Sequence, residues 1–150
     1  MTIISQLREE MIVPELAAKS KKEALTELAA TVHGAHPEID LDTLYEVLRT
    51  REKLGSTGIG DGIAIPHGKI KGLKEIIICF GRSAKGVHFD SHDNKPAHLF
   101  FLLLAPEESA ATYLGCLAEL SRFLKNPGIR SKLMHAKGRK EIAEIFAERI

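Results

Sequence analysis

The sequence predicts an α+β fold, a three-layer α/β/α sandwich in which helices flank a mixed central sheet. Two compact apolar runs carry this prediction, EIIICFG at 75–81 and AHLFFLLLA at 97–105. They are too short for long helices and are typical of central strands that are buried on both faces. The order along the chain is a strand, two helices, several strands and then helices, which indicates a sheet covered on both faces.

The composition fits one domain over residues 1–150 and excludes several classes of partner. The sequence has no internal repeat, low-complexity tract or linker, and no apolar run of about 18 residues that would span a bilayer. Its amino terminus lacks the features of a secretory signal, so we expect a cytoplasmic protein without membrane insertion. The net charge of +1 gives no field that would attract nucleic acid. Cys79 and Cys116 stand in apolar contexts and are interpreted as buried hydrophobic residues.

The amino-terminal third predicts one strand and two helices. The stretch MIVPELA is a candidate strand, and Pro14 favours a sheet edge or a bulge for it. The first helix follows Ser20 in the pattern of a capping box and is expected to end at Gly34. The second helix opens at Asp40 and is expected to end at Gly55, where a glycine-rich segment begins.

The rest of the chain predicts a short strand around GVHFD and then three helices. The first of these helices is expected to bury one face made of Ala110, Leu114, Leu117, Ser121 and Leu124. Asn126-Pro127 is typical of a helix start and begins the second. The third is expected to present a face made of Ile142, Ile145, Phe146 and Ile150.

The segment GSTGIGDGIAIPHGK at 55–69 fits neither of the two nucleotide-binding loop patterns. A P-loop requires Ser or Thr after its Gly-Lys pair, but Ile70 follows Gly68-Lys69 here. The dinucleotide fingerprint requires a strand before the glycines and a helix after them, whereas this segment leads from a helix into an expected strand, IAIPH. Pro66 stiffens the chain before His67 and would hold the imidazole beside backbone N–H groups, an arrangement that suits a negatively charged group. An ordinary turn with a surface histidine remains the alternative.

Residues 48–69, LRTREKLGSTGIGDGIAIPHGK, closely resemble the active-site signature of fructose/mannitol-type (type 2) enzyme IIA domains of the bacterial phosphoenolpyruvate:sugar phosphotransferase system. The match joins Arg51-Glu52, the turn at 56–60 and Pro66-His67-Gly68. The sequence GSTGIG and the single domain are most similar to the nitrogen-regulatory branch of that family.

The resemblance implies a phosphoryl carrier with a phosphohistidine intermediate rather than a free-standing metabolic enzyme. His67 aligns with the family's phosphorylated histidine, which accepts its phosphoryl group from an HPr-type carrier protein, and Arg51 aligns with the active-site arginine. Arg49 lies on the opposite edge of the same helix's apolar stripe, and the residues alone do not choose between the two arginines. We assign Thr57 and Gly60 of the matched turn to the support of the phosphoryl site.

Tyr113 stands where many family members have a second active-site histidine. Its hydroxyl is able to donate or accept a hydrogen bond near the phosphoryl group but carries no positive charge near neutrality. The glycines are interpreted as clearance for a docking carrier protein and as space around His67. No cofactor or metal is expected, because an arginine and backbone donors supply the positive field that the transition state requires.

Three interpretations of the function stay open on the sequence. The expected partners are an HPr-type carrier and either regulated target proteins or a IIB domain. A regulatory protein, a sugar-specific IIA that passes phosphate to a IIB domain, and a regulator without phosphotransfer are all compatible with the residues. A separate cluster, His88, Asp90 and His92, has the alternation of a metal site, but the turn chemistry of 93–96 favours a solvated connection.

Overall fold

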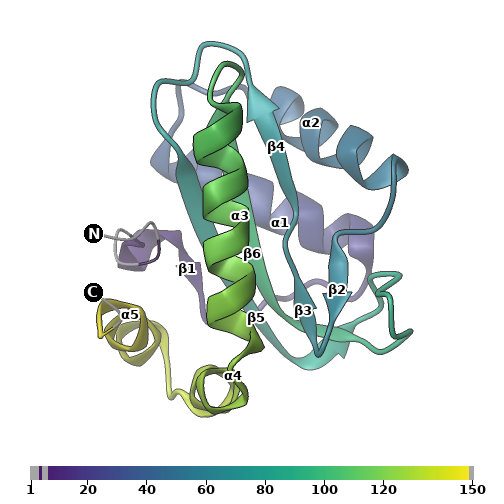
Figure 1. The fold of residues 1–150 in the computed structure, drawn as a ribbon, viewed down its shortest axis with the longest axis vertical. Helices are drawn as coiled ribbons and strands as arrows, with labels where there is room; N and C mark the ends of the chain where they lie inside the picture. The colour runs from purple at the N-terminus through teal and green to yellow at the C-terminus, as the bar shows by residue number, and fades with distance from the viewer. Residues whose placement is uncertain (1–3, 5–6, 149–150) are drawn as a thin grey trace.

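The computed structural model describes residue 4 and residues 7–148 and arranges them in three layers (Figure 1). Its mixed sheet has the strand order β1 (Ile12–Val13), β5 (Ile77–Val87), β6 (Ala97–Pro106), β3 (Ile63–Ala64) and β2 (Gly58–Gly60), and β4 (His67–Ile70) also pairs with β6. β5 and β6 are antiparallel, whereas β3 and β4 both run parallel to β6.

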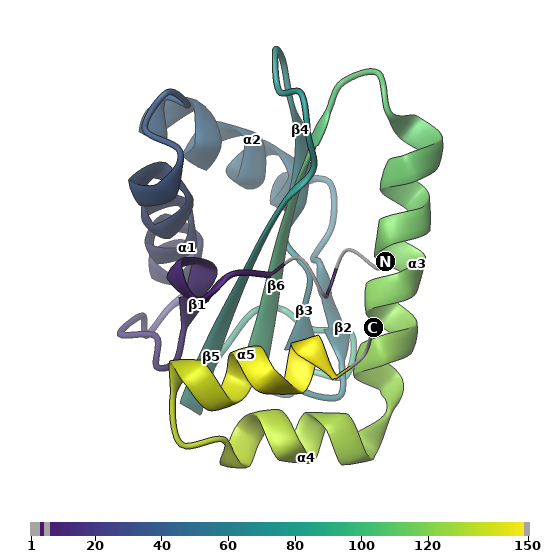
Figure 2. The same cartoon turned by 90° about the vertical axis from the view of Figure 1, so that its left-hand side faces the viewer.

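Helices cover both faces of the sheet. On one face lie α1 (Lys21–Ala35) and α2 (Leu41–Lys53), and on the other lies α3 (Ala110–Lys125) (Figure 2). The short helices α4 (Pro127–His135) and α5 (Arg139–Ala147) lie at one end of the sandwich. The predicted mixed sheet between two helical layers is therefore confirmed.

The first two helices begin where their capping residues predict. Ser20 Oγ accepts a hydrogen bond from the Glu23 amide at 3.2 Å, and the Asp40 carboxylate accepts one from the Thr43 amide at 3.0 Å. α1 continues through Gly34 to Ala35, so the predicted end is early by one residue. α2 ends at Lys53, and its last turn points toward the glycine-rich segment.

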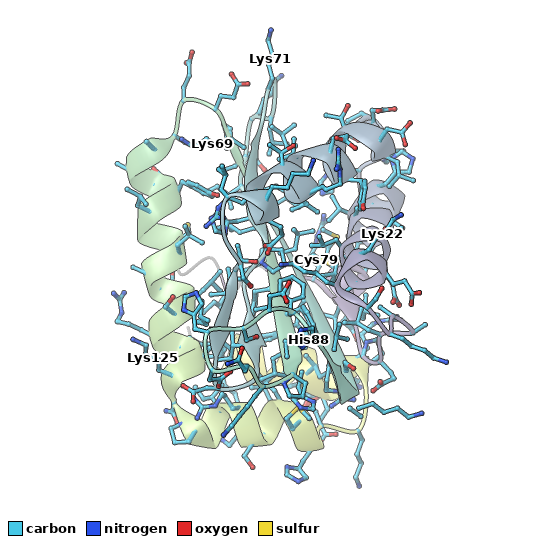
Figure 3. All side chains as sticks on the ribbon, turned by 90° about the vertical axis from the view of Figure 1, so that its right-hand side faces the viewer. Lys22, Lys69, Lys71, Cys79, His88 and Lys125 are labelled. Atoms are coloured by element: carbon cyan, nitrogen blue, oxygen red, sulfur yellow. The ribbon has the colours of Figure 1, made fainter. Side chains whose placement is uncertain are left out.

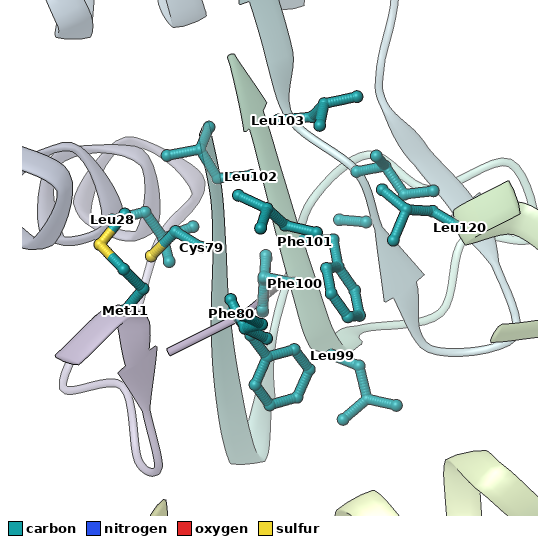
Figure 4. Packing of buried hydrophobic residues seen from close by; sticks show 14 of the residues in the cluster. Met11, Leu28, Cys79, Phe80, Leu99, Phe100, Phe101, Leu102, Leu103 and Leu120 are labelled. Carbon is teal, nitrogen blue, oxygen red and sulfur yellow. The ribbon is translucent and has the colours of Figure 1, made fainter. Parts of the chain in front are cut away.

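The two apolar runs form the centre of the core, as predicted. Every residue of β6 from Leu99 to Ala105 is buried, and Phe80 of β5 packs against Phe101 with ring centroids 5.1 Å apart (Figure 4). Phe146 of α5 packs against the same pair, with its ring centroid 5.2 Å from that of Phe80. The prediction of a separate strand at 86–90 was wrong. β5 itself continues past an irregularity to Val87 and still pairs with β6 there.

The strand in MIVPELA is β1, which lies at the sheet edge as Pro14 predicted. The glycine-rich segment, by contrast, is part of the sheet. β2 and β3 form an antiparallel hairpin, and both residues of its turn, Asp61 and Gly62, have positive φ, 57° and 78°. These angles fit the two-residue turns that match the twist of a hairpin. IAIPH is accordingly two strands, β3 and β4, separated by Ile65 and Pro66.

The buried face of α3 differs from the predicted one. Leu114 is 64% exposed, whereas Tyr113, its neighbour, is only 8% exposed. Neighbouring residues point about 100° apart on a helix, so this shift turns Tyr113 toward the sheet. The residues of α3 that are buried are Tyr113, Leu120, Phe123 and Leu124.

The remaining predictions for the carboxyl-terminal part hold with small changes. Pro127 is the first residue of α4, and Asn126 caps it through its side chain. In α5, Ile142 and Phe146 are buried, while Ile150 lies outside the described residues.

Cys79 is fully buried and Cys116 only partly so. No helix in the described part of the chain is long and apolar enough to cross a membrane.

Candidate functional site

His67 lies where all three layers of the fold meet. It is the first residue of β4, and its half-buried imidazole contacts one residue from each helical layer. Arg51, in the last turn of α2, donates a hydrogen bond from Nε to His67 Nε2 at 3.1 Å. Tyr113, in the first turn of α3, places its ring centroid 5.6 Å from that of the imidazole. The fold thus brings together three of the five predicted site residues.

The interruption between β3 and β4 fixes the position of the imidazole. The Pro66 carbonyl accepts a hydrogen bond from the Leu103 amide at 2.9 Å, which keeps the chain on β6 although proline has no N–H to donate. The Ile65 carbonyl then turns toward His67 and lies 2.8 Å from Nδ1. The rigid Ile65-Pro66 step therefore aims the ring.

The two hydrogen-bond partners of the ring define its tautomer. A guanidinium has only donors, so His67 Nε2 must accept from Arg51 with a free lone pair. A carbonyl only accepts, so Nδ1 must carry the proton that it donates to Ile65. Both contacts agree on a neutral imidazole whose Nε2 is nucleophilic.

Burial lowers the pKa of His67 below its usual value of 6.5. The hydrogen bond to the Ile65 carbonyl opposes this shift by raising the pKa, the charge of Arg51 lowers it further, and the charge of Glu52 raises it. The net lowering keeps the imidazole neutral at pH 7. This is the protonation state that a nitrogen nucleophile requires.

The geometry distinguishes between the two arginines of α2. Arg51 also donates from a terminal nitrogen to the Gly55 carbonyl at 2.9 Å, which holds the guanidinium across the turn that follows the helix. Arg49 points away and donates to the Glu46 carboxylate at 3.2 and 3.0 Å. Only Arg51 is placed beside His67.

The two residues of the matched turn occupy different places. Thr57 is buried, and both its amide and its hydroxyl donate to the Glu52 carboxylate, so neither donor is directed at His67. Gly60 pairs with Ile63, which is opposite Leu99 of β6, whereas His67 is opposite Leu103. Four residues along a strand correspond to about 13 Å. The register therefore separates Gly60 from His67.

Tyr113 contributes a neutral hydroxyl beside the imidazole. Burial raises its pKa to about 12, so the phenol keeps its proton at pH 7. Among the described residues its hydroxyl has no hydrogen-bond partner. The Lys69 ammonium lies 5.5 Å from the centroid of the Tyr113 ring, and Figure 3 shows Lys69 beside α3. Lys69 brings a positive charge to this side of the site.

Lys69 and Glu52 were not singled out from the sequence. Lys69 had a local signal, because residues two apart on a strand share one face and His67 was already a candidate. Glu52 was noted only as part of the matched motif. Its side chain is 6% exposed and binds Lys21 Nζ at 2.9 Å, a contact between distant segments that the sequence pattern does not predict.

The glycines provide clearance for other parts of the chain. A Cβ at Gly58 would lie 2.5 Å from Ser91 Oγ, and one at Gly68 would overlap Val47 Cγ1 of α2. Packing within the chain thus accounts for glycine at these two positions, and their role as clearance for a docking protein stays a prediction. Both glycines serve the packing that holds the site together.

The site lies outside the two cavities found in the described structure. Neither of two cavities, of about 790 and 250 Å³, is lined by His67, Arg51 or Tyr113. The half-buried His67 imidazole is therefore not enclosed by either cavity. The other histidine cluster brings only two of its three residues together, His88 and Asp90 at 3.2 Å, and the described residues contain no group of three that could hold a metal ion.

Known proteins are similar to this chain over nearly its whole length. Residues 5–149 match the family model described as phosphoenolpyruvate-dependent sugar phosphotransferase system, EIIA 2. A nitrogen regulatory protein of Bradyrhizobium diazoefficiens is 40% identical over 147 residues, which cover 98% of this chain and 95% of that protein.

Two solved structures have the same fold. The nitrogen regulatory protein IIA-Ntr from Neisseria meningitidis has a TM-score of 0.89 and 34% identity, with 97% of this chain and 99% of that chain covered. The Escherichia coli mannitol IIA, solved in complex with phosphorylated IIB, has a TM-score of 0.78 and 21% identity over 95% of this chain and 98% of that one. The predicted resemblance is confirmed, and the chain belongs to the EIIA 2 family of the phosphoenolpyruvate-dependent sugar phosphotransferase system.

Proposed function

We propose that this protein, acting as one domain over residues 1–150, is a regulatory phosphoryl carrier that accepts a phosphoryl group on His67 Nε2 from an HPr-type phosphohistidine carrier. One observation carries the proposal, namely that the hydrogen bonds to Arg51 and Ile65 leave the Nε2 lone pair on a neutral imidazole. Because phosphoenolpyruvate-driven phosphorylation takes place in the cytoplasm, the proposal includes a cytoplasmic location.

The transfer step exchanges one P–N bond for another. The Nε2 lone pair attacks the phosphorus of the donor's phosphohistidine, the donor's P–N bond breaks, and its electron pair returns to the donor's nitrogen. The Nδ1 proton stays on the ring and remains hydrogen-bonded to the Ile65 carbonyl, so no proton has to leave His67 for the new bond to form. The protein's contribution is alignment and charge stabilisation of a largely dissociative transition state.

Arg51 supplies the nearest positive charge. In the described structure Arg51 Nε donates to His67 Nε2, the nitrogen that attacks. As the phosphoryl group arrives, the guanidinium N–H groups therefore move from this nitrogen to the phosphoryl oxygens. The second contact, from Arg51 to the Gly55 carbonyl, keeps the guanidinium close during this movement. The neutral hydroxyl of Tyr113, which lacks a partner in the described structure, provides one further donor for the phosphoryl oxygens.

Phosphorylation in a reconstituted system tests the proposal. Incubation with enzyme I, an HPr-type carrier and phosphoenolpyruvate should add the mass of one phosphoryl group to the wild type and none to His67→Ala. His98→Ala is the matched control, because His98 is also hydrogen-bonded through Nδ1, to the Ser83 carbonyl, but lies outside the site. An unmodified wild type, or equal modification of His67→Ala, would overturn the proposal.

The regulatory output is supported by the relative from Bradyrhizobium diazoefficiens, whose name describes nitrogen regulation. A phosphoryl group adds up to about two negative charges beside Arg51, which is enough to change a docking surface without a change of fold. The likeness in fold to mannitol IIA in complex with IIB favours a second output, transfer to a IIB domain. Pull-downs with the phosphorylated wild type and with His67→Ala distinguish the two. A sugar-specific IIB as the sole state-dependent partner would contradict regulation.

A further inference from the structure

The Glu52 carboxylate is buried next to the site, and the transfer step described above does not use it. Its side chain is 6% exposed, compared with 56% for Glu46 on the same helix. A carboxylate at such depth is costly unless hydrogen bonds and an opposite charge compensate it. Glu52 has both, because it accepts from the amide and the hydroxyl of Thr57 and pairs with Lys21 Nζ at 2.9 Å.

One chain of contacts leads from Glu52 to the imidazole. Glu52 holds the Thr57 backbone through the Thr57 amide, at 3.1 Å. The Thr57 carbonyl accepts a hydrogen bond from the Ile65 amide at 2.9 Å. The Ile65 carbonyl in turn accepts from His67 Nδ1 at 2.8 Å. Each contact fixes the next. The position of the Ile65 carbonyl, which selects the tautomer of His67, therefore depends on Glu52.

A second chain of contacts leads from Glu52 to Arg51. The turn after α2 starts at Glu52 and returns at Thr57, and their hydrogen bonds close it. Within this turn the Gly55 carbonyl accepts from Arg51 at 2.9 Å. The same carboxylate thus holds the turn that orients the arginine and the strand end that orients the histidine.

We propose that Glu52 is a positioning residue for phosphoryl transfer, one that sets the tautomer of His67 and the orientation of Arg51 through Thr57. The inference rests on the proposed function of His67. Lys21 completes the arrangement: it neutralises Glu52, lies 4.8 Å above the Phe89 ring and 3.6 Å from Asp90, and thereby ties the carboxylate to α1 and to the segment after β5.

The central experiment compares Glu52→Gln with Glu46→Gln. Both remove one carboxylate charge from α2 without substituting His67 or Arg51, but only Glu52 holds Thr57. We expect the initial rate of phosphorylation by the HPr-type carrier to fall roughly 10- to 100-fold in Glu52→Gln, because a small misplacement of reacting groups has effects of this size. Glu46→Gln should retain the wild-type rate. Melting curves of both variants establish that they are folded at the assay temperature.

Nitrogen NMR of the His67 ring provides a readout that does not depend on phosphotransfer. The wild type should show a single tautomer with the proton on Nδ1, and Glu52→Gln should show a mixture of tautomers. A folded Glu52→Gln with wild-type ring signals overturns the inference, whatever its phosphorylation rate. Failure of the wild type to accept a phosphoryl group would instead overturn the proposed function and leave this measurement valid.

A second pair of variants covers the case in which Glu52→Gln does not fold. Thr57→Val removes the hydroxyl that donates to Glu52 but keeps the shape of the side chain, whereas Thr57→Ser keeps the hydroxyl. We expect Thr57→Val to reduce the phosphorylation rate and broaden the tautomer distribution, and Thr57→Ser to behave like the wild type. Equal ring signals in Thr57→Val and the wild type would overturn the inference.

Discussion

Arg51 Nε lies 3.1 Å from His67 Nε2, and the two residues come from different layers of the fold. The contact joins the carboxyl end of α2 to the first residue of β4, sixteen positions later in the chain. It also places the permanent positive charge of the site at the nitrogen that we propose as the phosphoryl acceptor. The arginine must therefore exchange one partner, the nitrogen lone pair, for another, the phosphoryl oxygens, in the course of the reaction.

This relationship predicts a large difference between the two arginines of α2. Arg51→Ala should reduce the phosphorylation rate by about 100-fold or more, the effect of removing one donor to a transition-state oxygen. Arg49→Ala should stay close to the wild type, because Arg49 only binds the exposed Glu46. Arg51→Lys should be intermediate, because an ammonium keeps the charge but lacks the planar fork of donors. Equal rates in the two alanine variants would refute the role of Arg51.

The pH dependence of His67 provides a second prediction. Burial lowers its pKa, with a further contribution from the charge of Arg51, so an NMR titration of the ring should have its midpoint below 6.5. Arg51→Ala should move that midpoint upward, because it removes a positive charge that disfavours the imidazolium. A midpoint at or above 6.5 in the wild type would contradict the description of a neutral, partly buried ring.

The same shift affects stability, with a sign that follows from proton linkage. Below pH 6.5 the unfolded chain binds a proton at His67 while the folded protein does not, so the free energy of unfolding should fall as the pH decreases from 6.5 toward the lower folded pKa. Above pH 6.5 this contribution is constant. His67→Gln should lose less stability over that interval, as measured by urea unfolding at a series of pH values. Identical slopes in the two proteins would show that His67 does not contribute.

The position of Tyr113 beside His67 predicts that removal of its hydroxyl shortens the lifetime of the phosphorylated state. Tyr113→Phe keeps the ring beside His67 and removes a hydroxyl without a partner in the described structure, so the unphosphorylated protein should change by no more than about 0.5 kcal/mol. The phosphohistidine should be lost about tenfold faster, since a hydrogen bond to a charged group is worth about 1.5 kcal/mol or more. Tyr45→Phe, at the other tyrosine of the chain, is the control. Equal lifetimes would exclude a phosphoryl contact for Tyr113.

Local signals were enough to predict much of the fold. The capping residues Ser20 and Asp40 mark helix starts because their hydrogen bonds are made within four residues. The β2–β3 hairpin also had a local signal, the Asp61-Gly62 dipeptide, whose positive φ angles fit a two-residue turn. It was missed because the glycines around it were interpreted as a loop for a partner.

The features that were not predicted depend on contacts between distant segments. The apolar spacing of α3 fits a face with Leu114 as well as one with Tyr113, and only the packing of the helix on the sheet selects Tyr113. Arg49 and Arg51 lie on opposite edges of one stripe, and the return of the chain from the hairpin decides which of them meets His67. Such choices are made by tertiary packing, which a single sequence pattern does not record.

The close approach of Gly68 to Val47 predicts that the site depends on packing between β4 and α2. In Gly68→Ala the new Cβ would overlap Val47 Cγ1, so we expect a loss of about 1–3 kcal/mol in the free energy of unfolding, the usual cost of overpacking. Displacement of β4 also moves the neighbouring His67 away from Arg51, and the phosphorylation rate should fall with it. Urea unfolding and the initial rate of phosphorylation measure the two effects.

A double mutant separates this steric effect from other effects of the substitution. Val47→Ala removes the methyl group that a Cβ at Gly68 would meet, so the double mutant should recover stability beyond the sum of the two single changes. Gly34→Ala is the matched control, because Gly34 lies within α1 and a Cβ there has no neighbour within 4 Å. That substitution should stabilise the protein by about 0.5–1 kcal/mol through helix propensity. Additive effects of Gly68→Ala and Val47→Ala on stability would show that contact with Val47 does not cause the loss in Gly68→Ala.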